Sequence, residues 1–416
     1  MASILFLAQV LPYPLDAGPK VRAYYVLRHL AQSHRVTLVS FVRPEDTPEH
    51  IAHLRTFCEQ VQPVPMHRSA WRTGRAAAIA LSTGRPVIIE RDRSPEMLAL
   101  LRSLVEMQRY DYIHADQTSM VQYALTASEA ALVHGSARPH LVLDAHNALF
   151  KVMERLAAQT RNPVLRLVFE REARHLRYYE AESYRRFDDV VFVTEEDRDR
   201  IGLAHAYAIP ICGDPDATPM APRRDGKRIT FAGALHWPPN AEGIRWFLNE
   251  VWPIVHRSLP DVTLTIIGKQ PPRDLVEMNR PNVETLGYVA DLQPFLAETC
   301  AWIVPLWSGG GMRVKIVDAW TWGVPVVSTR IGAEGLAYTD GENLLIADTP
   351  QDFAAAISRL VHNADLAESL RQAGRHTAIE RYGWRSVYTA WDAIYPPNAG
   401  RGATNPEPRA QPHTHG

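Results

Sequence analysis

Short apolar runs alternate with amphipathic segments along nearly the whole chain, and this alternation limits the fold more than any other feature. In the first half the apolar runs cover residues 4–10, 36–41, 61–66, 112–115, 141–145 and 190–194. Helical patterns lie between the runs, including one that predicts a single long helix over about 147–186. Strands that are apolar throughout, with helices between them, are typical of parallel sheets covered on both faces. The pattern therefore predicts an α/β fold with doubly wound sheets.

The alternation stops between residues 209 and 227 and then begins again. This stretch, IPICGDPDATPMAPRRDGK, contains four prolines and three aspartates and is predicted to be a linker between domains. The second series of apolar runs covers residues 229–232, 262–267, 283–286, 302–305, 324–328 and 344–347. We therefore expect one domain at 1–208 and another at 228–380. The polar tail 397–416, rich in proline and glycine, is predicted to be disordered.

The composition agrees with a globular protein of two domains. The chain has 416 residues, of which 46% are hydrophobic and 22% charged, and its formal net charge is −1. That balance excludes a global attraction to nucleic acid or to anionic membranes. The cysteines Cys58, Cys212 and Cys300 form no C-x-x-C pair, which argues against a disulfide scaffold or zinc knuckle and favours a reducing cytoplasm. The apolar start is interpreted as a buried strand rather than a signal peptide.

A glycine-rich stretch, SGGGMRVKIVDAWTWGVPVVST at 308–329, carries the strongest local signal of function. Gly309, Gly310 and Gly311 follow an apolar strand, and Arg313 and Lys315 follow the glycines at the predicted start of a helix. Backbone N–H groups at a helix start attract anions, and glycine lets a phosphate approach the backbone. The stretch is therefore interpreted as a diphosphate site, with a flexible loop and two solvated cations as the alternative. It matches neither the P-loop nor the G-x-G-x-x-G pattern.

Several stretches resemble glycosyltransferase family 4. GGGMRVKIVDAWTWGVPVVSTRIGAEGL is similar to the donor-site signature of that family, and FAGALHWPPNAEGIRWFLNEVWP is similar to the opening of its second domain. NVETLGYVADLQPFLAETCAWIVPLWSGGG and LPYPLDAGPKVRAYYVLRHLAQSHRVTLVSF extend the resemblance to about residues 4–390. The chain is especially similar to members found in exopolysaccharide biosynthesis.

This resemblance implies the GT-B architecture, in which two Rossmann-like domains face each other across a cleft. It also implies a hexosyltransferase that uses a nucleotide-activated sugar and retains the anomeric configuration; we expect the donor to be UDP- or GDP-linked. No metal or other cofactor is expected, because cationic side chains and helix N-termini can stabilise a diphosphate leaving group. The second domain would bind the nucleotide sugar and the first domain a glycan or lipid-linked acceptor. A helix over 381–396 would cross back to the first domain.

The resemblance also assigns donor-binding residues, with two departures from the family pattern. In the family motif E-x7-E, Asp318 stands at the second glutamate, the usual ribose ligand, and Gly310 stands at the first. A basic pair that is common in the family falls on Ala234 and Asn240, so Arg313 and Lys315 are the expected substitutes. Asn240 is expected to be a helix N-cap.

The first domain contributes a loop after its first strand, in which Gly18 matches the glycine that approaches the donor. The alternative for Gly18 is a simple turn, and Lys20 and Arg22 are further candidates for phosphate binding.

Two further candidates follow predicted strands. His146 ends HLVLDAH and matches the family's corresponding strand end, where the resemblance gives it a hydrogen bond to the sugar or transition state. Asp144 lies two residues earlier and is expected to orient His146; the alternative is a structural histidine. Glu334, in GAEGL, is either a donor contact or part of a turn.

Metal and membrane binding have weaker signals. Asp214 and Asp216 imitate a D-x-D metal motif but lie in the linker, and we expect no metal there. Residues 67–85 contain four arginines and Trp71, a pattern typical either of a lipid-surface contact or of a solvated helix face. We expect a cytoplasmic protein, with peripheral contact at the inner face of the cytoplasmic membrane as an open alternative.

Two other functions remain open at this point. One is an enzyme that resembles UDP-N-acetylglucosamine 2-epimerase and uses no acceptor. The other is a degenerate, non-catalytic subunit that binds a sugar nucleotide, which the glycine at position 310 keeps open.

Overall fold

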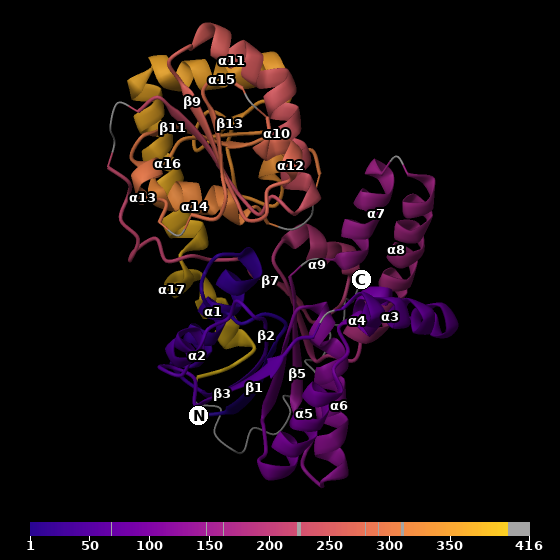
Figure 1. The fold of residues 1–416 in the computed structure, drawn as a ribbon. Coiled ribbons are helices and arrows are strands. Elements are labelled where there is room, and N and C mark those ends of the chain that lie inside the picture. The colour runs from indigo at the N-terminus through magenta and orange to yellow at the C-terminus, as the bar shows by residue number, and fades with distance from the viewer. Residues whose placement is uncertain are drawn as a thin grey trace, which may run out of the picture.

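The computed structural model describes residues 1–67, 69–146, 148–160, 162–222, 226–278, 280–289, 291–308 and 312–397. Within these residues the chain forms two α/β domains, one above the other in Figure 1, and each is built on a parallel sheet. The prediction of two doubly wound α/β domains is confirmed.

The first domain has a seven-stranded sheet in the order β3-β2-β1-β4-β5-β6-β7. Its strands are β1(Ser3–Ala8), β2(Arg35–Val42), β3(Gln60–Pro65), β4(Tyr112–Asp116), β5(His140–His146), β6(Asp189–Phe192) and β7(Ala206–Ala208). Its helices are α1(Gly18–Leu30), α2(Pro48–Leu54), α3(Ala70–Thr83), α4(Val87–Arg91), α5(Pro95–Met107), η1(Thr118–Met120), α6(Val121–Val133), α7(Leu149–Gln159), α8(Pro163–Tyr184) and α9(Glu195–Ile201). Leu5 and Leu7 of β1 pack in one apolar cluster and Ile4 and Phe6 in another, so both faces of the sheet are covered.

The second domain has a six-stranded sheet in the order β10-β9-β8-β11-β12-β13. Its strands are β8(Arg228–Ala232), β9(Thr263–Ile267), β10(Val283–Leu286), β11(Thr299–Val304), β12(Val326–Ser328) and β13(Leu345–Ile346). Its helices are α10(Pro238–Trp246), η2(Phe247–Val251), α11(Trp252–Ser258), α12(Arg273–Val276), α13(Gln293–Leu296), α14(Val314–Trp322), η3(Ile331–Ala333), α15(Pro350–His362) and α16(Ala364–Tyr382). In each sheet the strand order reverses beside the first strand, and ligands of such sheets bind beyond the carboxyl ends of the strands at that reversal.

The chain crosses between the domains twice, and the two crossings lie side by side. In the linker, the amide of Gly213 donates to the carbonyl of Tyr382 (2.9 Å), and the amide of Trp384 donates to the carbonyl of Gly213 (3.0 Å). Beyond this point α17(Trp384–Val387) and η4(Tyr388–Ala393) pack into the apolar core of the first domain. Trp391 and Tyr395 are completely buried there.

Two details differ from the sequence expectation. The helix expected over 147–186 is two helices, α7 and α8, which pack against each other as a hairpin (Figure 1). Asn162 caps α8, because its side chain accepts hydrogen bonds from the amides of Val164 and Leu165, and Pro163 takes the first helical position. The short strand β7 was not predicted.

Two further expectations meet the limits of the described residues. Residues 398–416 of the tail expected to be disordered lie outside them. No helix in the described part of the chain is both long and apolar enough to cross a membrane.

Candidate functional site

The candidate site lies where the strand order of the second sheet reverses, between β8 and β11. Helix α10 follows β8 and helix α14 follows β11, so both helices begin near the same edge of the sheet. Because helix N-termini carry a partial positive charge, this edge favours an anionic ligand.

Lys315 connects the two helices. Its Nζ donates to Oδ1 of Asn240 on α10 (2.7 Å) and lies 4.6 Å from the centroid of the Phe231 ring. A Cβ at Gly233 would lie 2.8 Å from this Nζ, so a larger residue there would displace the ammonium group. The ammonium group of Lys315 is thereby held at the reversal point of the sheet.

Asn240 does not have the role expected from sequence. Trp237 is the N-cap of α10, and Asn240 lies inside the first turn, where its Nδ2 donates to the carbonyl of Ala234 (2.8 Å). Ala234 and Asn240 are the positions at which the family pattern has its basic pair. Lys315 therefore brings a cation to the place where the resemblance indicated that one was missing.

Arg313 immediately precedes α14 and has φ −87° and ψ 76°, which are not helical angles. Its buried guanidinium donates to the carbonyl of Ile331 (3.3 Å) and lies 3.7 Å from a carboxylate oxygen of Glu334. Burial lowers the pKa of Arg313 to about 10, so the group is cationic at neutral pH. Gly309, Gly310 and Gly311, predicted to hold the diphosphate, lie outside the described residues.

Asp318 lies one turn beyond Lys315 on the same helix. Burial raises the pKa of Asp318 to about 7, and the nearby Lys315 offsets part of that rise. The pKa of Lys315 is lowered to about 7, mainly by burial and to a smaller extent by the charge of Arg313. Both groups are therefore held close to the point at which they gain or lose charge, as is common where a ligand is bound.

The first domain contacts this site through α7. The guanidinium of Arg155 donates to both carboxylate oxygens of Glu334, at 3.0 and 2.9 Å. Glu334 directly follows η3 in the second domain, so the bond joins the two domains beside Arg313. Sequence reasoning singled out Glu334 but missed Arg155, which carries no motif.

Gly18 also faces the second domain. It is the first residue of α1, and a Cβ there would lie 3.3 Å from Cγ2 of Val314, at the start of α14. A second ion pair, between Lys269 and Asp16, joins the domains close to this contact. The structure thus brings the loop that contains Gly18 to the edge of the site in the second domain.

Carboxylates of the first domain engage both Lys20 and Arg22. Lys20 forms ion pairs with Asp16 (3.2 Å) and Asp46 (3.9 Å). Arg22 is completely buried, and its guanidinium binds Asp144 (2.7 Å) and the carbonyl of Ile209 in the linker (2.6 Å). The candidate role of Arg22 in phosphate binding is therefore wrong: it holds the linker and β5 together.

His146 ends β5 with φ 56°, a value that is unusual for a residue other than glycine. Its Nε2 lies 2.8 Å from Oδ1 of Asp116, at the end of β4, and 3.7 Å from Oδ2 of Asp144. Asp144 was expected to orient His146, but its carboxylate is bound to Arg22 instead. Asp116 was missed, although it also stands at the carboxyl end of a predicted strand.

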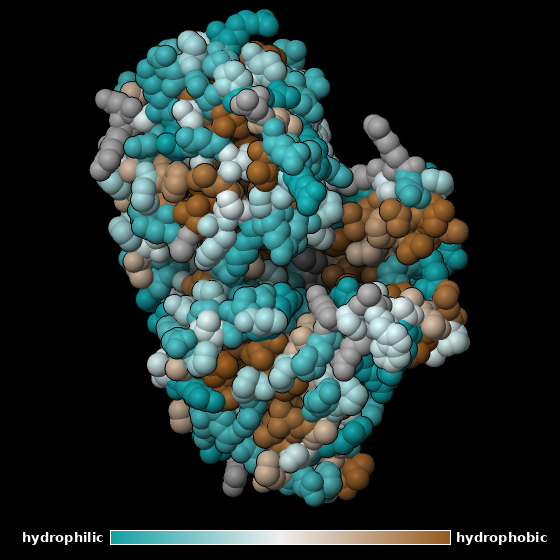
Figure 2. Space-filling model, in the orientation of Figure 1, coloured by the Kyte–Doolittle hydropathy of each residue, from teal (hydrophilic) through white to brown (hydrophobic). Residues whose placement is uncertain are grey.

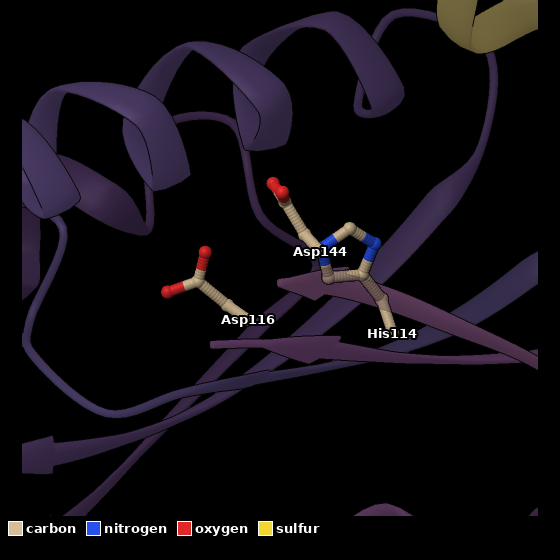
Figure 3. Close-up of side chains that lie close together, drawn as sticks. All are labelled: His114, Asp116 and Asp144. Atoms are coloured by element: carbon tan, nitrogen blue, oxygen red, sulfur yellow. The ribbon is translucent and has the colours of Figure 1, made fainter. Parts of the chain in front are cut away.

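His114, Asp116 and Asp144 lie together on β4 and β5 (Figure 3), with ligand atoms within 4.8 Å of one another. Burial raises the pKa of Asp116, which His146 partly offsets. Burial also opposes ionisation of Asp144, but Arg22 and His146 hold the pKa of Asp144 below its ordinary value. A metal ion here would stand beside the guanidinium of Arg22, and that repulsion disfavours a cation site.

The linker aspartates serve the crossing between domains. Asp214 is buried, forms an ion pair with Arg385 of α17 and accepts a hydrogen bond from the amide of Ala217 (3.2 Å). Asp216 lies 3.8 Å from the same arginine. Both contacts fix the linker against the C-terminal segment.

Comparison with known proteins places the second domain among glycosyltransferases. Residues 226–363 match the family model of glycosyl transferases group 1. An uncharacterized 44.6 kDa protein in the cps region of Klebsiella pneumoniae is 25% identical over 411 residues, which cover 94% of this chain and 99% of that protein. The lipopolysaccharide core biosynthesis glycosyltransferase LpsE of Rhizobium meliloti is 28% identical over 141 residues, covering 32% of this chain and 41% of LpsE.

Solved structures show the same two-domain fold over nearly the whole chain. HepE of Anabaena, in complex with UDP and glucose, superposes with a TM-score of 0.66 at 15% identity, covering 95% of this chain and 99% of HepE. WaaG, a glycosyltransferase involved in lipopolysaccharide biosynthesis, superposes with a TM-score of 0.63 at 13% identity, covering 95% of this chain and 100% of WaaG. The expected GT-B architecture is confirmed, and with the group 1 match in the second domain the chain is a glycosyltransferase.

Proposed function

We propose that the chain is a retaining glycosyltransferase similar to family 4, which transfers a hexose from a UDP- or GDP-linked donor to a glycan or lipid-linked acceptor. The observation that carries this proposal is the position of Lys315 and Arg313 at the start of α14, where the sheet order reverses and Gly18 faces them. This cationic edge lies inside the segment matched by the group 1 model. The relative in a cps region and the relative in lipopolysaccharide core biosynthesis support a role in making a polysaccharide or glycoconjugate.

In the proposed reaction the bond between the sugar C1 and the β-phosphate oxygen breaks. The acceptor oxygen bonds to C1 from the same face, and its proton passes to the departing phosphate. Lys315 and Arg313, together with the backbone at Gly309, Gly310 and Gly311, stabilise the diphosphate as it leaves. Fixed cations and N–H groups at a developing negative charge are an effective form of catalysis.

The remaining residues position the donor. Asp318 accepts hydrogen bonds from the ribose. Gly18 of the first domain and Glu334 of the second lie on opposite sides of the sugar and phosphate. His146 forms a hydrogen bond with the sugar, and Asp116 fixes its ring through the 2.8 Å contact. Asp144 acts one step further away by anchoring Arg22.

No divalent metal or other cofactor is part of the proposal, because side chains and helix N-termini supply the positive charge. The reaction is placed in the cytoplasm, where nucleotide sugars are the donors, with peripheral contact at the inner face of the cytoplasmic membrane.

The test is a panel of UDP-, GDP- and ADP-sugars incubated with the full chain, with and without oligosaccharide or lipid-linked acceptors. We expect a glycosylated product that forms in the presence of chelator, with the donor's anomeric configuration by NMR. Isomerised or hydrolysed donor without any acceptor would favour the epimerase alternative. Donor binding without turnover over the whole panel would favour a non-catalytic subunit.

A further inference from the structure

Helix α8 begins with an aliphatic surface that no other part of the described chain covers. Within its first two turns Val164, Leu165, Leu167 and Val168 are 68%, 46%, 68% and 51% exposed. These turns are regular helix with a capped start, so the exposure does not come from an irregular chain end. Figure 2 shows a hydrophobic patch over the α7–α8 hairpin, on the right of the view. Exposed apolar side chains that are contiguous on one surface mark an interaction site.

Arginines surround this aliphatic surface. A hollow of about 350 Å³ between α7 and α8 is lined by Arg166, Arg174 and Arg177, together with the carboxylates of Glu154 and Glu170. Both glutamates are already paired with arginines of the same hollow. The hollow therefore has an excess of positive charge directly beside the exposed aliphatic turns.

Helix α3 adds a second apolar and basic surface to the same unit. Trp71 and Leu81 are each 71% exposed, and Arg75 lies over the Trp71 ring at 5.8 Å. The sequence over 67–85 contains four arginines and no acidic residue. Arg171, one turn after Val168 on α8, donates a hydrogen bond to the carbonyl of Ala80 (2.8 Å). Ala80 directly precedes Leu81 on α3, so this bond joins the two surfaces.

We propose that α3 and the start of α8 form one docking surface for a bilayer that contains anionic phospholipid. Aliphatic and tryptophan side chains enter the interface between headgroups and acyl chains, while arginines bind lipid phosphates. Charge favours this occupant: three arginines against two glutamates line the hollow, and the sequence over 67–85 contains no acidic residue, whereas the whole chain has a net charge of −1. A second copy of this chain, with its net charge of −1, offers no such complement.

The position of the docking surface agrees with the proposed transfer of a sugar to a lipid-linked acceptor. This agreement rests on the proposed function. Arg155, which binds Glu334 across the cleft, stands four residues before the end of α7, about 6 Å along the helix. A membrane held by α8 would therefore lie close to the mouth of the cleft. Docking itself does not require that the transfer be correctly assigned.

The experiment is flotation of the full chain with vesicles of phosphatidylcholine alone or with 30 mol% phosphatidylglycerol, at low and high salt. We expect binding to the anionic vesicles that is at least tenfold stronger than to neutral ones and weakens in high salt. The double variant Val164→Glu/Leu167→Glu should lose at least tenfold in binding, and Arg174→Gln should weaken binding to anionic vesicles alone. Val133→Glu is the matched control, because Val133 is 83% exposed on α6.

Several outcomes would overturn the proposal. These are an unchanged affinity in the double variant, an equal loss in Val133→Glu, or no vesicle binding by the wild type. If the wild type formed a concentration-dependent dimer and the double variant stayed monomeric, this surface would instead be a contact between copies of the chain. Calorimetry with UDP and GDP on the same proteins separates the two proposals, since the double variant should keep wild-type nucleotide affinity whether or not it binds vesicles.

Discussion

Arg155 in the first domain and Glu334 in the second form a two-pronged ion pair, at 3.0 and 2.9 Å, beside the buried guanidinium of Arg313. Each side chain of the pair is about one-third exposed, at 33% and 31%, so solvent weakens the attraction. The pair joins the first domain to the proposed donor site. It also neutralises a carboxylate that would otherwise repel a diphosphate.

The first prediction tests this pair by a double-mutant cycle. Arg155→Ala and Glu334→Ala should each lower kcat/KM for transfer by about five- to tenfold, corresponding to about 1 kcal/mol of lost coupling. The kcat/KM of the double variant should be no lower than that of the less active single variant. Losses that simply add in the double variant would show that the two residues act independently.

The second prediction separates Asp116 from Asp144, which stand opposite each other in the register of β4 and β5. Asp144→Ala leaves Arg22 buried without its partner, so it should cost about 3–5 kcal/mol of unfolding free energy. Asp116→Asn keeps the shape of the side chain but removes the charge that fixes His146. It should lower kcat by about tenfold or more while the melting temperature changes little. Urea unfolding and steady-state kinetics on both variants check this, and equal effects on stability would contradict it.

The sequence predicted the sheets well because a strand buried on both faces must be apolar, whatever else surrounds it. Twelve apolar runs were expected and each corresponds to a strand; β7, only three residues long, was missed because its pattern is too short to recognise. The break between α7 and α8 had a local signal, Asn162 followed by Pro163, that the long helical pattern obscured.

The site was predicted less completely, for a physical reason. Motifs mark residues that follow strands, and they identified His146, Lys315 and Glu334. The partners of these residues depend on strand register and on how the domains meet. Asp116 ends β4 and Asp144 lies within β5. That His146 is closer to Asp116 (2.8 Å) than to Asp144 (3.7 Å) depends on how these strands pair, which no motif records. Arg155 contacts Glu334 across two domains, which no local pattern records.

The third prediction concerns the pH dependence of nucleotide binding. Burial lowers the pKa of Lys315 to about 7, and a bound diphosphate favours its charged form. Between pH 7 and 8.5 the diphosphate is ionised throughout, so affinity should fall as Lys315 loses its proton, approaching about tenfold per pH unit. Calorimetry with UDP or GDP, whichever binds, measures this slope. Lys315→Met should bind more weakly at pH 7 and show a much flatter profile, and an unchanged slope in that variant would assign the titration to another group.

The fourth prediction follows from Asp318, whose pKa burial raises from 3.8 to about 7. Between these values the folded state holds a proton that the unfolded state has lost, so ionisation destabilises the fold increasingly as the pH rises. Asp318→Asn removes this cost. The variant should therefore gain stability relative to wild type increasingly from pH 4 to pH 7, by at most about 4 kcal/mol. Donor affinity should fall in the same variant, because Asn carries no charge for the ribose hydroxyls. Thermal unfolding across this pH range, with donor titration at pH 7.5, checks both; a constant difference in stability would contradict the assigned burial.

The last prediction tests whether the domains must meet closely at Gly18. A Cβ at this position would lie 3.3 Å from Cγ2 of Val314, so in Gly18→Ala this methyl group at the start of α14 must shift by a few tenths of an ångström. Because effective transfer depends on close placement of the reacting groups, that small shift should lower kcat/KM by about tenfold while leaving nucleotide affinity near wild type. Val314→Ala removes the methyl group that the new side chain would meet. The double variant Gly18→Ala/Val314→Ala should therefore recover most of the lost activity, whereas Val314→Ala alone should change it little. Steady-state kinetics on the three variants decide the matter, and a double variant as slow as Gly18→Ala would show that Gly18 is needed for another reason than contact with Val314.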